Sequence, residues 1–178
     1  MLWSRRDRRS DTRPLCISHG AGWPGDDGER YLREFDWTGT RDPGAWLVVP
    51  DCIDLLGSLR SGGWAAHIQE NRALALRARE LLCEALEIDV PAPESMVGAL
   101  AAVPIGPGPE LESPGWSTDP LQELLAERWS TEVIVSRWPL EPERVLRVSA
   151  QAYNSEDEMR FLADILKRIL SEGHRDRG

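Results

Sequence analysis

The stretch from residue 64 to 86 constrains the fold more than any other, because its apolar side chains recur in steps of three and four. This spacing predicts one long amphipathic helix, which must bury a single stripe against another part of the protein. Gly62 and Gly63 break the chain before the helix, and Pro91 and Pro93 end it. The stripe comprises Trp64, Ile68, Asn71, Ala75, Ala78, Leu82 and Ala85.

Asn71 is the one polar residue of this stripe. We interpret it as a buried amide with satisfied hydrogen bonds, because a polar group without a partner is costly inside a protein. A hydrogen bond across a contact between two domains is the alternative interpretation. His67 lies on the same helix and has no obvious partner in the sequence.

The second half of the chain carries three strand patterns. Residues 98–105 predict a buried strand, and residues 132–136 and 144–150 predict two more. Two prolines separate the last two strands and suit a connection rather than a paired strand. Residues 106–118 are rich in Gly, Pro and Ser, which predicts a linker or surface loop.

Helices alternate with these strands. Asp119 and Pro120 supply a capping acceptor and a first helical proline, which predicts a short helix to about Trp129. Residues 155–158 form a capping box that begins the last helix, whose apolar stripe includes Met159, Leu162, Leu166 and Ile169. The order helix, strand, helix, strand, strand, helix predicts an α+β lobe within the α/β class, with a small sheet and helices on one side.

The first sixty residues are less regular. The sequence predicts short strands at residues 2–3 and 14–18 and an irregular Gly-rich loop at residues 19–28. A helix is expected over residues 42–56, beginning with an acidic cap and a proline, and kinked or divided at Pro50.

Charge and composition narrow the function classes. The formal net charge is −9 and the pI is about 4.9, which argues against a nucleic-acid-binding protein. We interpret the one basic cluster, residues 5–9, as a solvated turn. No run approaches the 18 or so apolar residues that a membrane-spanning helix needs. Three irregularly spaced cysteines argue against a disulfide framework, so a cytoplasmic location is expected.

No metal site is expected. Cys16 and His19 are three residues apart and would face opposite sides of a strand, and no second ligand pair follows. Cys52 and Cys83 are interpreted as small apolar core residues.

Arg147 is the first candidate for chemistry. Strand alternation places Val145, Arg147 and Ser149 on one face and Leu146 and Val148 on the other, so the arginine points away from the apolar face. A guanidinium there could bind a carboxylate through two parallel hydrogen bonds. On alternation alone, an ordinary solvated arginine is the favoured interpretation.

The residues from Arg147 through Ser149 to Tyr153 and Asn154, followed by an acidic helix start, resemble class V aminotransferase-like enzymes. These are fold-type I enzymes that use pyridoxal phosphate (PLP). In that family the arginine binds the α-carboxylate of the amino-acid substrate, and the resemblance implies this role for Arg147. Tyr153 and Asn154 are interpreted as a structural corner leading into the last helix.

A second candidate is Thr38-Gly39-Thr40, just ahead of an expected helix start. A hydroxyl and a glycine backbone there suit an anion, although Pro43 removes one donor and Asp42 adds a negative charge. A simple capping turn is the alternative. Residues 34–46 resemble the isopenicillin N epimerase-like branch of the family. That resemblance implies that Gly39 and Thr40 contact the PLP phosphate of a neighbouring subunit, and therefore a homodimer.

The resemblance extends over most of the chain and implies three parts. Residues 1–62 resemble the end of the PLP-binding large domain and its dimer interface. Residues 63–88 resemble the helix that links the two domains, and residues 89–178 resemble the small C-terminal domain, with a short, mostly antiparallel sheet.

Lys167 is the single lysine of the chain, and it lies in the last helix with no cofactor motif around it. The family's Schiff-base lysine would lie just before Met1, so no catalytic residue is assigned. We therefore expect the C-terminal part of an isopenicillin N epimerase-like enzyme, arising from a truncated gene model, a frameshift or a split gene, inactive alone and unable to hold PLP stably.

Two other hypotheses remain open. The chain could be a non-catalytic remnant that binds or regulates an intact relative through the dimer interface. It could also be a free-standing carboxylate binder that uses Arg147. Epimerisation, desulfuration and transamination share this scaffold, so the resemblance does not choose the reaction.

Overall fold

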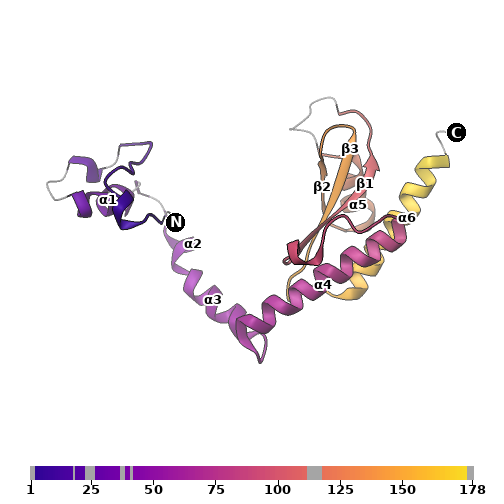
Figure 1. Ribbon diagram of the computed structural model, residues 1–178, viewed down its shortest axis with the longest axis horizontal. Helices are drawn as coiled ribbons and strands as arrows, with labels where there is room; N and C mark the ends of the chain where they lie inside the picture. Colours follow the sequence, from indigo (N-terminus) through magenta and orange to yellow (C-terminus); the bar gives the residue numbers. More distant parts are fainter. Residues whose placement is uncertain are drawn as a thin grey trace. The chain divides into compact units, whose positions relative to one another are not determined.

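The computed structural model describes residues 3–17, 19–22, 27–36, 39–40, 42–111 and 118–175. The chain divides into two compact units, Met1–Asp51 and Cys52–Gly178 (Figure 1). None of the helices within the described ranges is long and apolar enough to cross a membrane.

A three-stranded antiparallel sheet organises the second unit (Figure 1). The strands are β1 (Leu100–Pro107), β2 (Ile134–Arg137) and β3 (Glu143–Ser149), in the order β1-β3-β2. The register of β1 shifts between Pro104 and Gly106, and Gly106 adopts a φ of +74°, which favours glycine at this bulge. All three expected strands are therefore confirmed, although β1 begins and ends two residues later than the pattern indicated.

Three helices supply the apolar core on one face of this sheet: α4 (Gly63–Leu86), α5 (Pro120–Trp129) and α6 (Glu156–Arg175). Their apolar residues and the inward-facing residues of the strands form one cluster. The expected α+β lobe with helices on one side of a small sheet is confirmed. The largest fully buried apolar side chains are Leu82, Val103, Leu125, Leu146 and Leu166.

The helix ends follow local capping chemistry. The Asp119 carboxylate accepts a hydrogen bond from the Leu121 amide at 2.9 Å and caps α5 as expected. The capping box of α6 is also present, with the Ser155 amide donating to Glu158 and the Glu158 amide donating to Ser155. Helix α4 stops at Leu86 because Glu87 adopts the left-handed conformation, four residues before Pro91.

The long helix was predicted with nearly correct bounds, but its stripe is only partly buried. Trp64 and Ile68, in the first turns of α4, are exposed. Burial against the sheet and α6 covers the later members of the stripe, including Ala75, Ala78 and Leu82. The sequence pattern is helical over the whole of α4, whereas the sheet and α6 pack only against the C-terminal part of this helix.

The strands expected in the first unit are wrong where the structure describes them. Trp3 and residues 14–17 are not in strands, and Leu15 and Ile17 are almost fully exposed. A strand needs a partner for its ladder, and none of the described residues of this unit forms one. Leu2 and Ser18, the remaining members of these expected strands, lie outside the described residues.

This unit contains short helices instead. They are η1 (Arg6–Arg8), η2 (His19–Gly22) and α1 (Asp27–Asp36), so the expected irregular loop over residues 19–28 contains helical turns at both ends. Residues 23–26 of that loop lie outside the described residues. Glu34 of α1 is fully buried and pairs with Arg13 at 2.7 Å.

The expected helix after Asp42 is divided, as the proline indicated. It forms α2 (Gly44–Leu47) and α3 (Val49–Ser58), with Pro50 in the first turn of α3, where proline is tolerated. The Asp42 carboxylate accepts from the Gly44 amide at 2.8 Å, and α2 begins at Gly44, one residue later than the expected start at Pro43. Cys83 is buried as expected, whereas Cys52 on α3 is exposed, so its interpretation as a core residue was wrong.

Candidate functional site

Arg147 lies at the centre of the sheet face that none of the described helices covers. It sits on the middle strand β3, opposite Ala102 of β1 and Ile134 of β2. Leu146 and Val148, on either side of it in sequence, are buried in the helix-covered core. The predicted alternation of β3 is therefore confirmed, and the arginine is exposed.

Arg147 has no hydrogen bond or ion pair with the other described residues of the chain. Arg144, three residues earlier on β3, is buried and pairs with Asp119 at 3.1 Å. Arg137 on β2 pairs with the same carboxylate at 3.1 Å. Among the described residues of this sheet, Arg137 and Arg144 are thus paired with a carboxylate, and the Arg147 guanidinium is available to an external anion.

The Asp119 cluster was not predicted from the sequence. Its carboxylate caps α5 and also neutralises Arg144, which donates further to the carbonyl oxygens of Gly106 and Pro107. A side chain at Gly108 would collide with this cluster, because a Cβ atom there would lie 2.4 Å from Arg137 Nη1. These contacts hold β1, β3 and α5 together, so the role of the cluster is to stabilise the fold.

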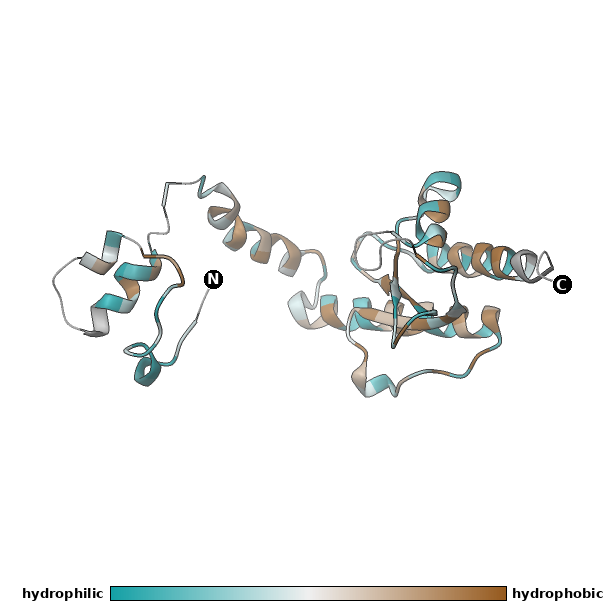
Figure 2. Cartoon of the chain, turned by 90° about the horizontal axis from the view of Figure 1, so that it is seen from above, coloured by the Kyte–Doolittle hydropathy of each residue, from teal (hydrophilic) through white to brown (hydrophobic). Residues whose placement is uncertain are grey.

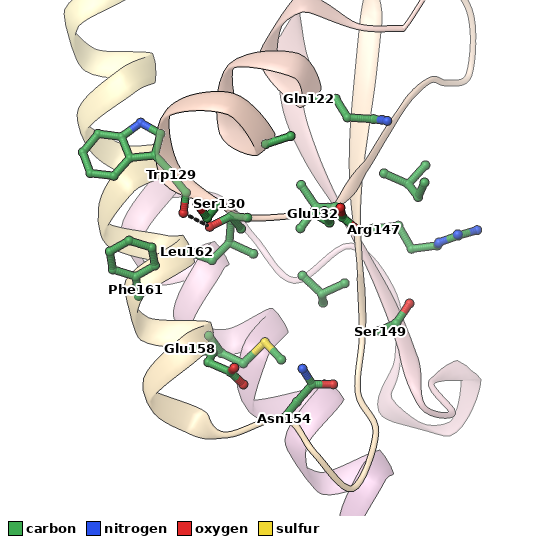
Figure 3. A pocket seen from close by; sticks show the side chains of 16 residues that line it. Gln122, Trp129, Ser130, Glu132, Arg147, Ser149, Asn154, Glu158, Phe161 and Leu162 are labelled. Carbon is green, nitrogen blue, oxygen red and sulfur yellow. Dashed lines mark hydrogen bonds between the residues drawn. The ribbon is translucent and has the colours of Figure 1, made fainter.

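A pocket opens beside Arg147, between the end of α5, the strands and the start of α6 (Figure 3). Figure 3 shows the Arg147 side chain directed away from Trp129 and Phe161, which stack edge-on with ring centroids 6.2 Å apart. Asn154 lies at the pocket and accepts a hydrogen bond from the Gln151 amide at 3.0 Å. That bond shapes the turn into α6, whereas Tyr153 is exposed.

A buried amide chain connects α4 to this turn. Asn71 Nδ2 donates to Gln151 Oε1 at 3.0 Å and lies 3.2 Å from His67 Nε2. The interpretation of Asn71 as a satisfied buried amide is confirmed. His67 does have a partner, contrary to expectation, and Gln151 was missed because 80 residues separate it from Asn71.

An ion pair joins α4 to α6 at the surface. Arg77 Nε donates to Glu156 at 2.9 Å, and Arg160 also contacts this carboxylate. The hydrogen bond from Arg77 is the main reason that the pKa of Glu156 lies below its usual value. Burial raises the pKa of the Cys83 thiol, which keeps this core cysteine in its unreactive protonated form.

Gly39 and Thr40 belong to the first unit and are exposed. Gly39 has a φ of +107°, a conformation that favours glycine, and no atom of the described residues beyond its chain neighbours lies within 4 Å of where its Cβ would be. The following helix α2 has only four residues, so the expected help from a helix dipole is absent. Thr38, the first member of the motif, lies outside the described residues.

Lys167 lies on the exposed side of α6, next to the fully buried Leu166. Lys167 is therefore an ordinary solvated side chain. Cys16 is exposed, and none of the His, Cys, Asp and Glu groups among the described residues is arranged to hold a metal ion.

No protein-family model matches the chain. Two curated relatives are similar to it. Isopenicillin N epimerase from Streptomyces clavuligerus is 33% identical over 143 residues, which are 79% of this chain and 33% of the relative. Isopenicillin N epimerase from Amycolatopsis lactamdurans is 34% identical over 153 residues, 82% of this chain and 35% of the relative. The chain spans about a third of the length of the curated relatives it matches.

Proposed function

Because the chain belongs to the isopenicillin N epimerase-like branch of the class V aminotransferase family, we propose that it forms the substrate-binding part of a PLP-dependent enzyme. Its role in that enzyme is to hold the carboxylate of an amino-acid substrate. We propose that the complete enzyme is an epimerase, and the name of both relatives, isopenicillin N epimerase, supports this proposal.

Arg147 is the observation that carries this proposal. Its guanidinium stands on a rigid central strand, has exposed N–H donors and makes no contact with a carboxylate of the described chain. A planar guanidinium can donate two parallel hydrogen bonds to one carboxylate, which fixes both the position and the orientation of a substrate. Orientation of this kind lowers the entropic part of a reaction barrier.

PLP, when bound, supplies an electron sink for bonds at the substrate's Cα. The residues of this chain fit non-covalent contacts with the cofactor and its substrate. They do not fit the covalent attachment of the cofactor. Lys167 does not fit the Schiff-base role, because it is exposed on α6 on the side opposite the core. Since it is the chain's only lysine, the attachment lysine is proposed to come from a part of the enzyme outside these 178 residues.

Gly39 and Thr40 are proposed to contact the cofactor phosphate of a neighbouring subunit in a homodimer. Their exposure and the conformation of Gly39, which lets a backbone approach an anion closely, support this role. By itself this chain is proposed to be inactive and to hold PLP only weakly.

Calorimetric titration tests the role of Arg147. The chain is titrated with alanine and with ethylamine, which lacks only the carboxylate. Alanine should bind and ethylamine should not, and Arg147→Gln should abolish the alanine signal. Arg128→Gln is the matched control, because Arg128 is also exposed and lies on α5, away from the sheet face. Equal alanine binding by the Arg147 variant and the unmodified chain would refute the assignment.

A second candidate function is regulation of an intact relative through pairing with it. It is favoured by the apolar side chains that α2 and α3 expose, since neither helix has a buried residue. Figure 2 colours the chain by hydropathy and shows apolar residues on these helices. Size-exclusion chromatography of a mixture with a full-length relative should show a shared peak, which Ile53→Glu should disperse. Separate elution at all ratios would remove this candidate. The exposed apolar residues are Trp46, Leu47, Val48, Val49, Ile53 and Leu55.

A further inference from the structure

The uncovered sheet face is apolar on both sides of its one arginine. Ala102 and Ile134 are the direct cross-strand neighbours of Arg147. Because directly paired residues of antiparallel strands share a face, alternate residues of all three strands line the same surface. These are Leu100, Ala102 and Pro104 of β1, Ile134 and Ser136 of β2, and Val145, Arg147 and Ser149 of β3.

A groove of about 710 Å³ runs along this face, and Arg147 is one of the residues that line it. This is within the range of roughly 300–1,000 Å³ that is usual for small-molecule sites. Three large apolar side chains line it and are strongly exposed: Met96 is 76%, Trp138 63% and Leu100 50% accessible. A cluster of exposed apolar side chains beside an unpaired cation fits a ligand that carries both an anionic and an apolar part.

The other charged residues of the groove offer little to a polar ligand. Arg79 donates to the Ala92 carbonyl oxygen at 2.8 Å, and Arg144 is held by Asp119. Glu143 lines the groove but is four residues from Arg147 on the same strand, a separation of about 13 Å at the usual rise of a strand. An acidic or basic side chain on a short amino acid would therefore lose water without gaining a partner.

We infer that this groove receives the apolar side chain of the amino acid whose carboxylate Arg147 holds, so the enzyme's substrate class is amino acids with bulky apolar side chains. The inference rests on the proposed function, because Arg147 must be the carboxylate anchor. Burying the side chain against Leu100 and Ala102 removes water from around the guanidinium–carboxylate pair. The loss of water strengthens that pair as well as adding apolar contact.

A chain-length series tests the inference on the 178-residue protein. The ¹⁵N-labelled chain is titrated with glycine, alanine, norvaline and norleucine, and Kd is obtained from the amide shifts of β1 and β3. The Kd should fall about fourfold for each methylene added from alanine onwards, which corresponds to full burial of that group. Glutamate, which matches norleucine closely in length, should bind no better than alanine.

Three variants separate the groove from the anchor. Leu100→Ser should weaken norleucine binding about tenfold, which corresponds to the loss of contact with one to two methylenes, while leaving glycine unchanged. Leu140→Ser is the matched control, because Leu140 is 77% exposed and does not line the groove. Arg147→Gln should remove binding of the whole series.

The outcomes distinguish the assignment of the groove from the assignment of Arg147 as the carboxylate anchor. Binding that depends on Arg147 but has the same Kd for glycine and norleucine overturns the groove assignment and leaves the carboxylate anchor in place. Binding of norleucine that survives Arg147→Gln, or binding of none of the four amino acids, overturns both. A Leu140→Ser effect as large as that of Leu100→Ser also counts against the groove.

Discussion

The two faces of the sheet differ in whether their arginine is paired with a carboxylate. On the helix-covered face, Arg144 is buried and Asp119 neutralises it at 3.1 Å. On the open face, Arg147 is exposed and has no carboxylate partner among the described residues. The two arginines are three residues apart on one strand, so burial rather than residue type decides which is structural. A buried guanidinium without a partner would be very costly, whereas an exposed one retains its water until a ligand arrives.

The largest expected effect tests the covered face. Asp119→Ala should lower the free energy of unfolding by about 3–5 kcal/mol, because it leaves Arg144 buried without its counter-charge. It also removes the cap of α5, which adds about 1 kcal/mol. Urea unfolding followed by circular dichroism measures the loss. A change smaller than about 1 kcal/mol, the range of an exposed ion pair, would show that Arg144 is solvated rather than buried.

The next effect compares apolar residues on the two faces. Leu146→Ala should cost about 2–5 kcal/mol, because Leu146 is fully buried and its removal leaves a cavity. Leu100→Ala on the open face should cost only about 1 kcal/mol, since half of that side chain is already in contact with water. The same urea titration compares them, and equal losses would mean that another layer covers the open face.

The smallest effect concerns the surface ion pair between α4 and α6. The pKa of Glu156 is lowered by Arg77, so the folded protein favours the ionised carboxylate. The stability that this pair adds is present above the unfolded pKa of about 4.3 and is lost as the pH falls through the lower folded pKa. Glu156→Gln should therefore unfold at slightly lower temperature than the unmodified chain at pH 7.

The pH dependence supplies the check on that prediction. The difference in melting temperature between Glu156→Gln and the unmodified chain should shrink as the pH is lowered towards 3. A constant difference over this range would mean that the variant acts through packing rather than charge.

Sequence reasoning succeeded where the signal was local. The helices α4 and α6 were predicted because side-chain periodicity and capping residues lie within a few positions of one another. The face of β3 that carries Arg147 followed from alternation alone. These features need no knowledge of the rest of the fold.

The failures involve partners that are distant in sequence. Residues 14–17 have the composition of a strand, but no described strand pairs with them. Asp119 and Arg144 are 25 residues apart, and Asn71 and Gln151 are 80 apart, so neither contact leaves a local pattern. The groove depends in the same way on the hairpin that brings Trp138 to the β1 face.

The central claim is that Arg147 makes the open face a carboxylate site, and an NMR titration with alanine tests it most directly. The account predicts amide shifts at Ala102, Ile134 and Arg147, with the helix-covered residues unmoved. It also predicts that Arg147→Gln abolishes the shifts without changing the urea midpoint, since surface substitutions alter stability by only about 0.5 kcal/mol. Alanine-induced shifts that persist in the folded Arg147 variant would contradict it.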